Sequence, residues 1–323
     1  MAANPGAMIA LRQIRDAAGR IAPWVRRTPL LSAPALSERA GRPIFLKPEF
    51  WQETGSFKVR GATNYLLAVG AATDGGGVVT ASTGNHGQAV AWAAARLGVR
   101  AVIAVPAAAP RAKLDGIRRR GGELRPINGG YDAAHAAALA MAAGEGLRYV
   151  PAFEDEVIIA GQGTIGLEIA EDLPEVAEVY VPVGGGGLAA GVGAALAAAA
   201  PSARLVGAQS VLTPAMARSL AAGSPVAVPE PPTLCDGLAG GIDALTLTYA
   251  QRYLADLALV EEADVAAAMR ALVADERWIV EGSAAVALAA ALRTGRAGAG
   301  PAVVVLTGRN VDAETVRGVL LPQ

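Results

Sequence analysis

The chain has 323 residues, a formal net charge of −1 at pH 7 and a pI near 6.2. This balance offers no basic surface for nucleic acid or for an anionic membrane, so a small molecule is the expected partner. One cysteine, Cys235, and two histidines, His86 and His135, exclude an internal disulfide and a zinc site of ordinary spacing. The length fits about two domains or one large α/β domain.

The first segment, residues 1–25, interleaves charged and apolar side chains at helical spacing. Arg12, Arg15, Asp16 and Arg20 interrupt what would otherwise be the apolar core of a secretory signal. We therefore expect a cytoplasmic protein.

Apolar runs rich in valine and isoleucine alternate with alanine-rich segments along most of the sequence. The runs predicted as strands are residues 42–47, 77–81, 100–106, 178–183, 203–209 and 301–308. Glycine and proline clusters at 121–130 and 223–233 indicate breaks between elements. Continuous apolar strands separated by helices are typical of a parallel sheet covered on both faces. The expected fold class is therefore α/β.

Three of the predicted strands end in unusual turns. The strand at 77–81 runs into STGNHG, residues 82–87, and the strand at 178–183 runs into four glycines. The last strand ends at Thr307, followed by Gly-Arg-Asn. Because ligands of parallel α/β sheets lie beyond the carboxyl ends of the strands, these three ends are expected to line one crevice.

The four glycines form a candidate phosphate cradle, since their backbone N–H groups are exposed at the start of a helix whose dipole favours an anion. They are Gly184, Gly185, Gly186 and Gly187. A flexible turn is the plainer interpretation. The glycines also satisfy the G-x-G-x-x-A pattern of a dinucleotide-binding site. Such a site needs an acidic residue at the end of the next strand, where this chain has Gln209 and Ser210.

The turn at residues 82–87 offers backbone amides and the hydroxyls of Ser82 and Thr83 at another strand-to-helix junction. These groups could hold a carboxylate. Ordinary helix N-capping by serine, threonine or asparagine explains the same residues without a ligand.

Lys58 is one of three lysines in a chain with 25 arginines, and it lies between Phe57 and Val59 near the start of a predicted helix. The positive helix terminus and desolvation would both favour its neutral amine. A neutral lysine is a nucleophile toward carbonyls and can form a Schiff base. A surface lysine with a buried stem is the ordinary alternative. Together with a phosphate cradle, the amine predicts a phosphate-bearing aldehyde as the ligand.

Five motifs spread along the chain carry a family resemblance. They are LKPEFWQETGSFKVRGA at 46–62, ASTGNHGQA at 81–89, IAGQGTIGLEI at 159–169, VPVGGGGLAAG at 181–191 and VVVLTGRNVD at 303–312. In this order they resemble the serine/threonine dehydratase group of fold-type II pyridoxal-phosphate enzymes. The resemblance implies pyridoxal 5′-phosphate as the cofactor and a tryptophan synthase β-like fold of two parallel-sheet α/β domains. It also implies a large domain formed by residues 1–66 and 151–323, a small mobile domain at 67–150, and a homodimer or homotetramer.

The resemblance also implies a role for each matching residue. Lys58 would hold the cofactor as a Schiff base and later remove the Cα proton, and Phe57 would pack on the ring. Asn85 would bond the ring hydroxyl and Thr307 would sit at the pyridine nitrogen. The phosphate would lie on Gly184 to Gly187 and Leu188. The substrate carboxylate would lie on the loop formed by Ser82, Thr83, Gly84 and His86.

The activity implied is the β-elimination of a β-hydroxy amino acid, such as L-threonine or L-serine, to a 2-oxo acid and ammonia. Thr83 stands where serine racemase has a proton-returning serine, so racemisation at Thr83 is an open alternative. The dehydratase of hydroxyectoine utilisation is another branch that shares these motifs. Asp236 and Glu281 resemble positions near the cofactor. The family's cation-binding acids have no match at residues 210–216, so no metal is expected.

Three other functions compete with this interpretation. A β-replacement enzyme resembling cysteine synthase usually has GNTG where this chain has GNHGQ. A nicotinamide-dependent oxidoreductase would use the four glycines but leaves Lys58 unexplained. A binding protein without catalysis would make the combination of Lys58, Asn85 and Thr307 a coincidence.

Overall fold

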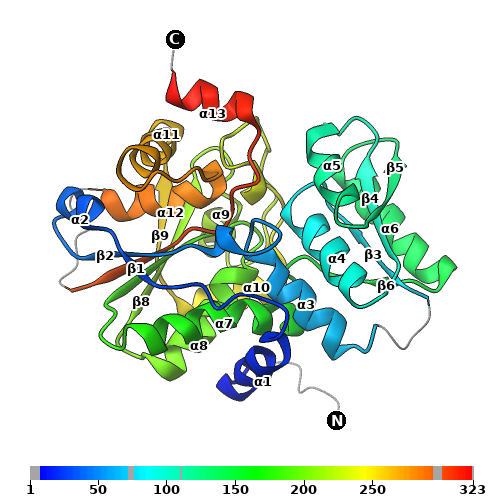
Figure 1. Cartoon of the computed structure of the whole chain (residues 1–323), viewed down its shortest axis with the longest axis horizontal. Coiled ribbons are helices and arrows are strands. Elements are labelled where there is room, and N and C mark those ends of the chain that lie inside the picture. The colour runs from blue at the N-terminus through cyan, green and yellow to red at the C-terminus, as the bar shows by residue number, and fades with distance from the viewer. Residues whose placement is uncertain (1–7, 72–75, 110, 294–299, 322–323) are drawn as a thin grey trace.

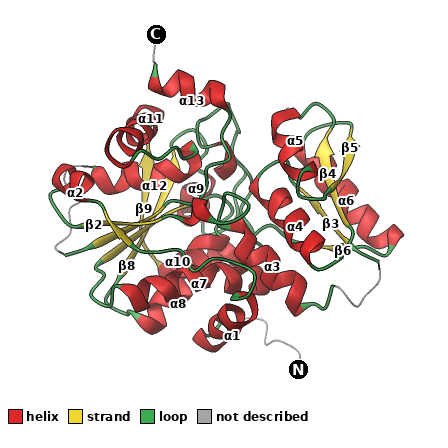
Figure 2. Ribbon diagram, in the orientation of Figure 1, coloured by secondary structure: helices red, strands yellow, loops and turns green. Residues whose placement is uncertain are grey.

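The computed structural model describes residues 8–71, 76–109, 111–293 and 300–321. Residues 1–7 of the N-terminal segment and of the expected large domain lie outside this description, as do 72–75 and 110 of the expected small domain. Two separate sheets, each accompanied by helices, make up the described chain (Figures 1 and 2).

The larger sheet has six strands in the order β1-β2-β10-β7-β8-β9. Their bounds are β1 Leu31–Ser32, β2 Ile44–Lys47, β7 Glu178–Pro182, β8 Arg204–Ser210, β9 Leu254–Val260 and β10 Ala302–Val305. Every pair is parallel except β1 with β2, which is antiparallel. The central strands β7 and β10 are buried at every residue, which accounts for their continuous apolar sequences.

The smaller sheet has four parallel strands in the order β5-β4-β3-β6. Their bounds are β3 Val78–Ala81, β4 Ala101–Pro106, β5 Glu123–Ile127 and β6 Arg148–Tyr149. The six predicted strands and the parallel α/β fold class are confirmed. Strand β5 corrects the prediction of a break at 121–130: Pro126 is tolerated because β5 is an edge strand.

Thirteen α-helices lie within the described residues. They are α1 Leu11–Ile21, α2 Pro34–Ala40, α3 Lys58–Ala68, α4 Asn85–Arg96, α5 Arg111–Arg118, α6 Tyr131–Glu145, α7 Glu156–Asp172, α8 Gly187–Ala199, α9 Ala215–Ala222, α10 Ala244–Tyr253, α11 Glu262–Ala271, α12 Gly282–Leu292 and α13 Ala313–Leu320. Short 3₁₀ turns cover η1 Glu49–Trp51 and η2 Asp236–Leu238, and a π-turn covers η3 Leu272–Glu276. Among these described helices none is both long and apolar enough to span a membrane.

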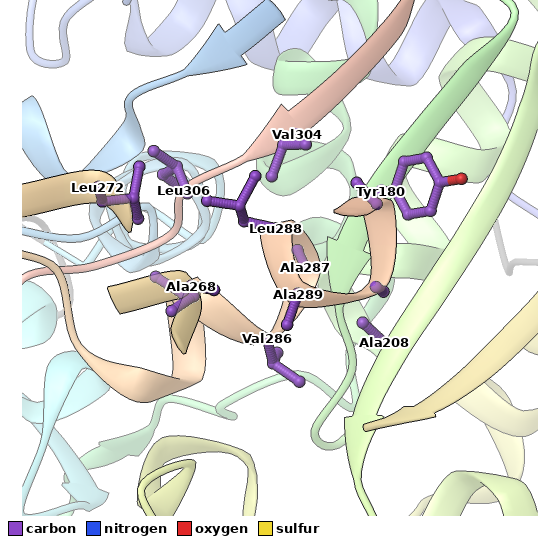
Figure 3. Packing of buried hydrophobic residues seen from close by; sticks show 14 of the residues in the cluster. Tyr180, Ala208, Ala268, Leu272, Val286, Ala287, Leu288, Ala289, Val304 and Leu306 are labelled. Carbon is purple, nitrogen blue, oxygen red and sulfur yellow. The ribbon is translucent and has the colours of Figure 1, made fainter. Parts of the chain in front are cut away.

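The largest part of the core lies around α12, whose small side chains pack against the six-stranded sheet. Figure 3 shows Leu288 and Ala289 of this helix among Val304 of β10, Ala208 of β8 and Tyr180 of β7, all members of one buried cluster. Ten of the eleven residues of α12 are buried, so its alanine-rich, uniformly apolar sequence suits its position.

Helix α3 and the connection between β6 and α7 join the two sheets. In Figure 1, α3 lies between the four-stranded sheet with its helices and the six-stranded sheet with its own, and it packs on both α4 and α7. The chain therefore passes from one unit to the other along α3 and returns through residues 150–155. Lys58 is the first residue of α3.

Candidate active site

The segment before Lys58 is fastened to the chain leaving β10. Ser56 and Gly308 form an isolated antiparallel bridge, and the N–H of Phe57 donates to the carbonyl oxygen of Thr307 at 3.0 Å. Thr307 itself is 3% exposed. The structure thus brings together two predicted site residues, Lys58 and Thr307, that lie at opposite ends of the sequence.

The amine of Lys58 lies in a partly buried position and forms no salt bridge with any residue that the structure describes. Its Nζ donates to the carbonyl oxygen of Ala152 at 2.9 Å and lies 5.5 Å from the Phe57 ring centre. Burial lowers the pKa of Lys58 to about 8, although the charge of Glu154 acts in the opposite direction. The amine is therefore neutral in a substantial fraction of molecules near neutral pH.

Lys47 lies in a different environment from Lys58. Its Nζ is fully buried and forms an ion pair with Glu168 at 2.7 Å, and it also donates to the carbonyl oxygen of Thr28 at 2.7 Å. Of the two lysine side chains that the structure describes, only Lys58 has no carboxylate within ion-pair distance. The alternative of a surface lysine at position 58 is not supported.

The four glycines form a tight loop between β7 and the start of α8. A Cβ on Gly185 would lie 2.5 Å from the Phe153 ring, and a Cβ on Gly187 would lie 2.9 Å from the Cβ of Phe153. Gly186 has φ +94°, a conformation that disfavours other residues, and a Cβ there would lie 2.8 Å from the terminal methyl of Met216. Any side chain would crowd this loop, as expected for a cradle in which backbone N–H groups meet a phosphate.

The loop at residues 82–87 leads into α4, whose N-cap is Gly84. No side chain caps this helix; the Ser82 hydroxyl instead accepts a hydrogen bond from the N–H of Gly84 at 3.2 Å. Ser82 and Thr83 are partly exposed. The N-capping alternative is therefore wrong for this turn. The first N–H groups of α4 have no side-chain cap and are available to a bound anion.

His86 is buried in the first turn of α4, with its Nε2 3.3 Å from the carbonyl oxygen of Val150. Burial and the neighbouring charge of Lys58 lower the pKa of His86 to about 3, against a smaller opposing effect of Val150. The imidazole is neutral at physiological pH. It fastens the loop to the connection between β6 and α7.

Asn85 begins α4 and contacts two residues of the other unit. Its Nδ2 donates to Glu281 Oε1 at 2.8 Å, and its Oδ1 accepts from Asn310 Nδ2 at 2.6 Å. Sequence reasoning gave no role to Asn310. The one available signal was its place three residues after Thr307 in the motif at 303–312.

The remaining candidates are placed as follows. Leu188 is 5% exposed in the first turn of α8. Asp236 is exposed at the start of η2. Cys235 is fully buried with a raised thiol pKa, chiefly because of burial, in keeping with its interpretation as a small core residue. Gln209, where the dinucleotide pattern would need an acid, donates to the carbonyl oxygen of Val183 at 3.2 Å.

The sequence of the chain matches a family model over residues 21–308, described as "Pyridoxal-phosphate dependent enzyme". The chain belongs to this family. It is 39% identical over 311 residues to the L-threonine ammonia-lyase of Geobacter sulfurreducens, covering 96% of this chain and 77% of that protein. Pyridoxal 5′-phosphate is accordingly its cofactor, and the glycine cradle and the partly buried Lys58 amine fit a phosphate-bearing aldehyde.

Solved structures give the same result for the fold of this pyridoxal-phosphate enzyme. The structure of maize serine racemase superposes with a TM-score of 0.92 at 32% identity and covers 96% of each chain. The processed form of threonine deaminase isoform 2 from Solanum lycopersicum superposes with a TM-score of 0.91 at 32% identity, covering 99% of this chain and 92% of that one. Membership of the serine/threonine dehydratase group and the tryptophan synthase β-like fold are both confirmed.

Proposed function

We propose that this enzyme dehydrates and deaminates a β-hydroxy amino acid, such as L-threonine or L-serine, to a 2-oxo acid and ammonia. The observation that carries the proposal is the Lys58 amine, which donates to the carbonyl oxygen of Ala152 at 2.9 Å, next to Phe153, the residue against which Gly185 and Gly187 pack. Relatives named L-threonine ammonia-lyase support the choice of substrate.

Lys58 has two roles in the proposed reaction. Its amine holds the cofactor before the substrate arrives, and once released it takes the proton from the substrate Cα. Bound pyridoxal 5′-phosphate withdraws electrons from Cα and so acidifies that hydrogen. A pKa of about 8, below the ordinary lysine value of 10.5, leaves more free amine to accept this proton near neutral pH than an exposed lysine would have.

Ser82, Thr83, Gly84 and His86 form the proposed receptor for the substrate carboxylate. The first-turn N–H groups of α4 point toward this position, and the helix dipole favours a negative charge there. His86 would act through its neutral ring and its contact with Val150 and not as a cation.

The cofactor would be held by Gly184 to Gly187 and Leu188 at its phosphate, with Phe57 on its ring, Asn85 at its ring oxygen and Thr307 at its ring nitrogen. A threonine hydroxyl donates a hydrogen bond to the ring nitrogen but, unlike a carboxylate partner, does not keep that nitrogen fully protonated. The resulting moderate electron withdrawal favours loss of the β-hydroxyl over transamination.

We further propose that residues 67–150 form a small domain that closes on the large domain, residues 1–66 and 151–323. The two passages of the chain, α3 and residues 150–155, would then serve as hinges. Closure would bring the 82–87 loop onto the substrate carboxylate and exclude water. A cytoplasmic homodimer or homotetramer without a bound metal completes the proposal.

Racemisation is the second candidate activity. Thr83 places a partly exposed hydroxyl in the substrate loop, where it could return a proton to the opposite face of Cα. Serine racemases at 36% identity support this alternative.

The decisive experiment is the visible absorbance of the purified enzyme before and after addition of L-threonine and then L-serine. A yellow band that changes with substrate, together with accumulating 2-oxo acid, is expected. Chiral chromatography of the remaining serine measures racemisation in the same reaction. A protein that stays colourless after incubation with pyridoxal 5′-phosphate would refute the proposal.

A further inference from the structure

The side-chain amide of Asn85 is held at both ends by residues of the six-stranded unit. Glu281 Oε1 accepts from its Nδ2 at 2.8 Å, and Asn310 Nδ2 donates to its Oδ1 at 2.6 Å. Asn310 Nδ2 also donates to the carbonyl oxygen of Thr54 at 2.9 Å. We call Glu281, Asn85 and Asn310 the amide relay.

The relay allows only one orientation of each amide. Both hydrogens of the Asn310 Nδ2 have acceptors, so this group cannot present its oxygen to Asn85 without losing two hydrogen bonds. A flipped Asn85 would place Oδ1 against the Glu281 carboxylate and Nδ2 against another N–H donor. Acceptor and donor neighbours thus fix which end of Asn85 is nitrogen.

The relay lies directly against the two segments that position Lys58 and Thr307. The N–H of Glu281 donates to the carbonyl oxygen of Gly308 at 3.1 Å, and a Cβ on Gly308 would lie 2.4 Å from Glu281 Oε1. A Cβ on Gly55 would lie 2.8 Å from Asn310 Oδ1. A side chain at either position would displace an atom of the relay, and at Gly55 the φ of +76° also favours glycine.

The Asn85 Nδ2 carries two hydrogens, of which Glu281 takes one. The second N–H is the group that would reach the ring oxygen of the cofactor, and the hydrogen bond that Asn85 Oδ1 accepts from Asn310 polarises the amide and strengthens it as a donor. We propose that Glu281 and Asn310 are positioning residues: they hold Asn85 so that it donates to the cofactor ring oxygen, and they tie α4 to the large sheet. This inference rests on the proposed function, in which Asn85 bonds that oxygen.

The test is a double-mutant cycle on the Kd for pyridoxal 5′-phosphate and on the visible absorbance of the substrate-free holoenzyme. Asn310→Ala should raise the Kd roughly tenfold and shift the band maximum, since the amide loses its fixed orientation. On an Asn85→Ala background the same substitution should change the Kd less than about twofold, because the residue acts through Asn85. Glu281→Gln should shift the absorbance maximum when Asn85 is present and leave it unchanged on the Asn85→Ala background.

Asp312→Ala is the matched control. Asp312 lies two residues from Asn310 and accepts from the N–H of Thr315 at 2.7 Å, so its loss loosens the same segment without touching the relay. Its band and Kd should equal those of the wild type. If Asn310→Ala does not fold, Asn310→Asp and Glu281→Gln complete the same cycle.

If the wild-type enzyme binds the cofactor and is coloured, two results would overturn the inference. One is an unchanged absorbance maximum in the Asn310 and Glu281 variants. The other is an equal rise in the Kd for the cofactor with and without Asn85. A colourless wild-type protein would instead refute the proposed function and the inference together. The two failures are therefore distinguishable.

Discussion

Lys58 Nζ and the carbonyl oxygen of Ala152 lie 2.9 Å apart and join the first residue of α3 to the connection between β6 and α7. These are the two places where the chain passes between its two sheets. The Lys58 amine is therefore positioned by both passages, and a movement of one sheet relative to the other would change the position of this amine.

Replacing Lys58 by alanine should abolish turnover and leave the protein folded. Lys58 has no ion pair with a described residue, so its removal leaves no buried charge without a partner. The measurement is 2-oxo acid formation alongside a circular dichroism melt. Lys58→Arg, which keeps a positive charge but cannot form the bond to the cofactor, should be equally inactive. Normal turnover in either variant would contradict the assignment.

The lowered pKa of Lys58 predicts a pH-dependent stability for the cofactor-free enzyme. Between about pH 8 and the ordinary lysine pKa of 10.5, the unfolded chain binds a proton at Lys58 that the folded chain does not. The unfolding free energy of the wild type relative to Lys58→Met should therefore rise from pH 8 to pH 10. Urea titrations at these pH values measure the difference. A constant difference would show that the pKa is not lowered.

Gly185→Ala should weaken cofactor binding, because the added methyl would lie 2.5 Å from the Phe153 ring in the proposed phosphate cradle. We expect a loss of at least tenfold in affinity, or about 1.4 kcal/mol, measured by titration of the cofactor-free protein. Gly144→Ala is the control: nothing lies within 4 Å of its Cβ, and alanine favours helix α6. Equal affinity in both variants would argue against the cradle.

The buried ion cluster behind α3 should be a large contributor to stability. Arg60 is paired with Glu49 at 2.8 Å and with Glu168 at 2.6 Å, and its charge lowers the pKa of Glu49 although burial alone would raise it. Arg60→Met would leave Glu49 without its ion pair and Glu168 with Lys47 as its remaining partner, at a cost of about 3–5 kcal/mol in unfolding free energy.

The control for Arg60 is Arg100→Ala, which breaks the exposed pair with Glu123 at 2.9 Å. That change should cost much less than Arg60→Met, since water screens the exposed pair. Chemical denaturation at pH 7 compares the two variants. Similar losses in both would contradict the importance of burial.

Thr83→Ala should reduce racemisation more than elimination, because only the return of a proton to the opposite face needs the Thr83 hydroxyl. We expect the ratio of D-serine to pyruvate formed from L-serine to fall about tenfold or more. Thr83→Ser keeps the hydroxyl and should preserve the ratio. An unchanged ratio in Thr83→Ala would assign the proton return to another group.

The local sequence was enough to predict the α/β class, six of the strands and the cofactor, while the roles of the individual site residues stay predictions. Valine-rich runs form strands wherever both faces are covered, and glycine repeats such as Gly184 to Gly187 are needed wherever backbone approaches backbone or ligand. These are short-range requirements. Strands β1, β5, β6 and β9 were missed. Strands β1 and β6 have only two residues each, and β5 is an edge strand that tolerates Pro126. The apolar sequence of β9 gave a signal that was not used.

The amide relay was decided by the tertiary structure alone. Asn85 meets Glu281 across 196 residues and Asn310 across 225, and no pattern within one segment encodes such a contact. The same holds for the pKa of Lys58. The sequence determined that an amine stands at the start of α3, but the burial that lowers its pKa and the opposing charge of Glu154 depend on how the chain folds around it. Residue type and local spacing set which chemistry is available, whereas packing between distant segments sets its geometry and its charge state.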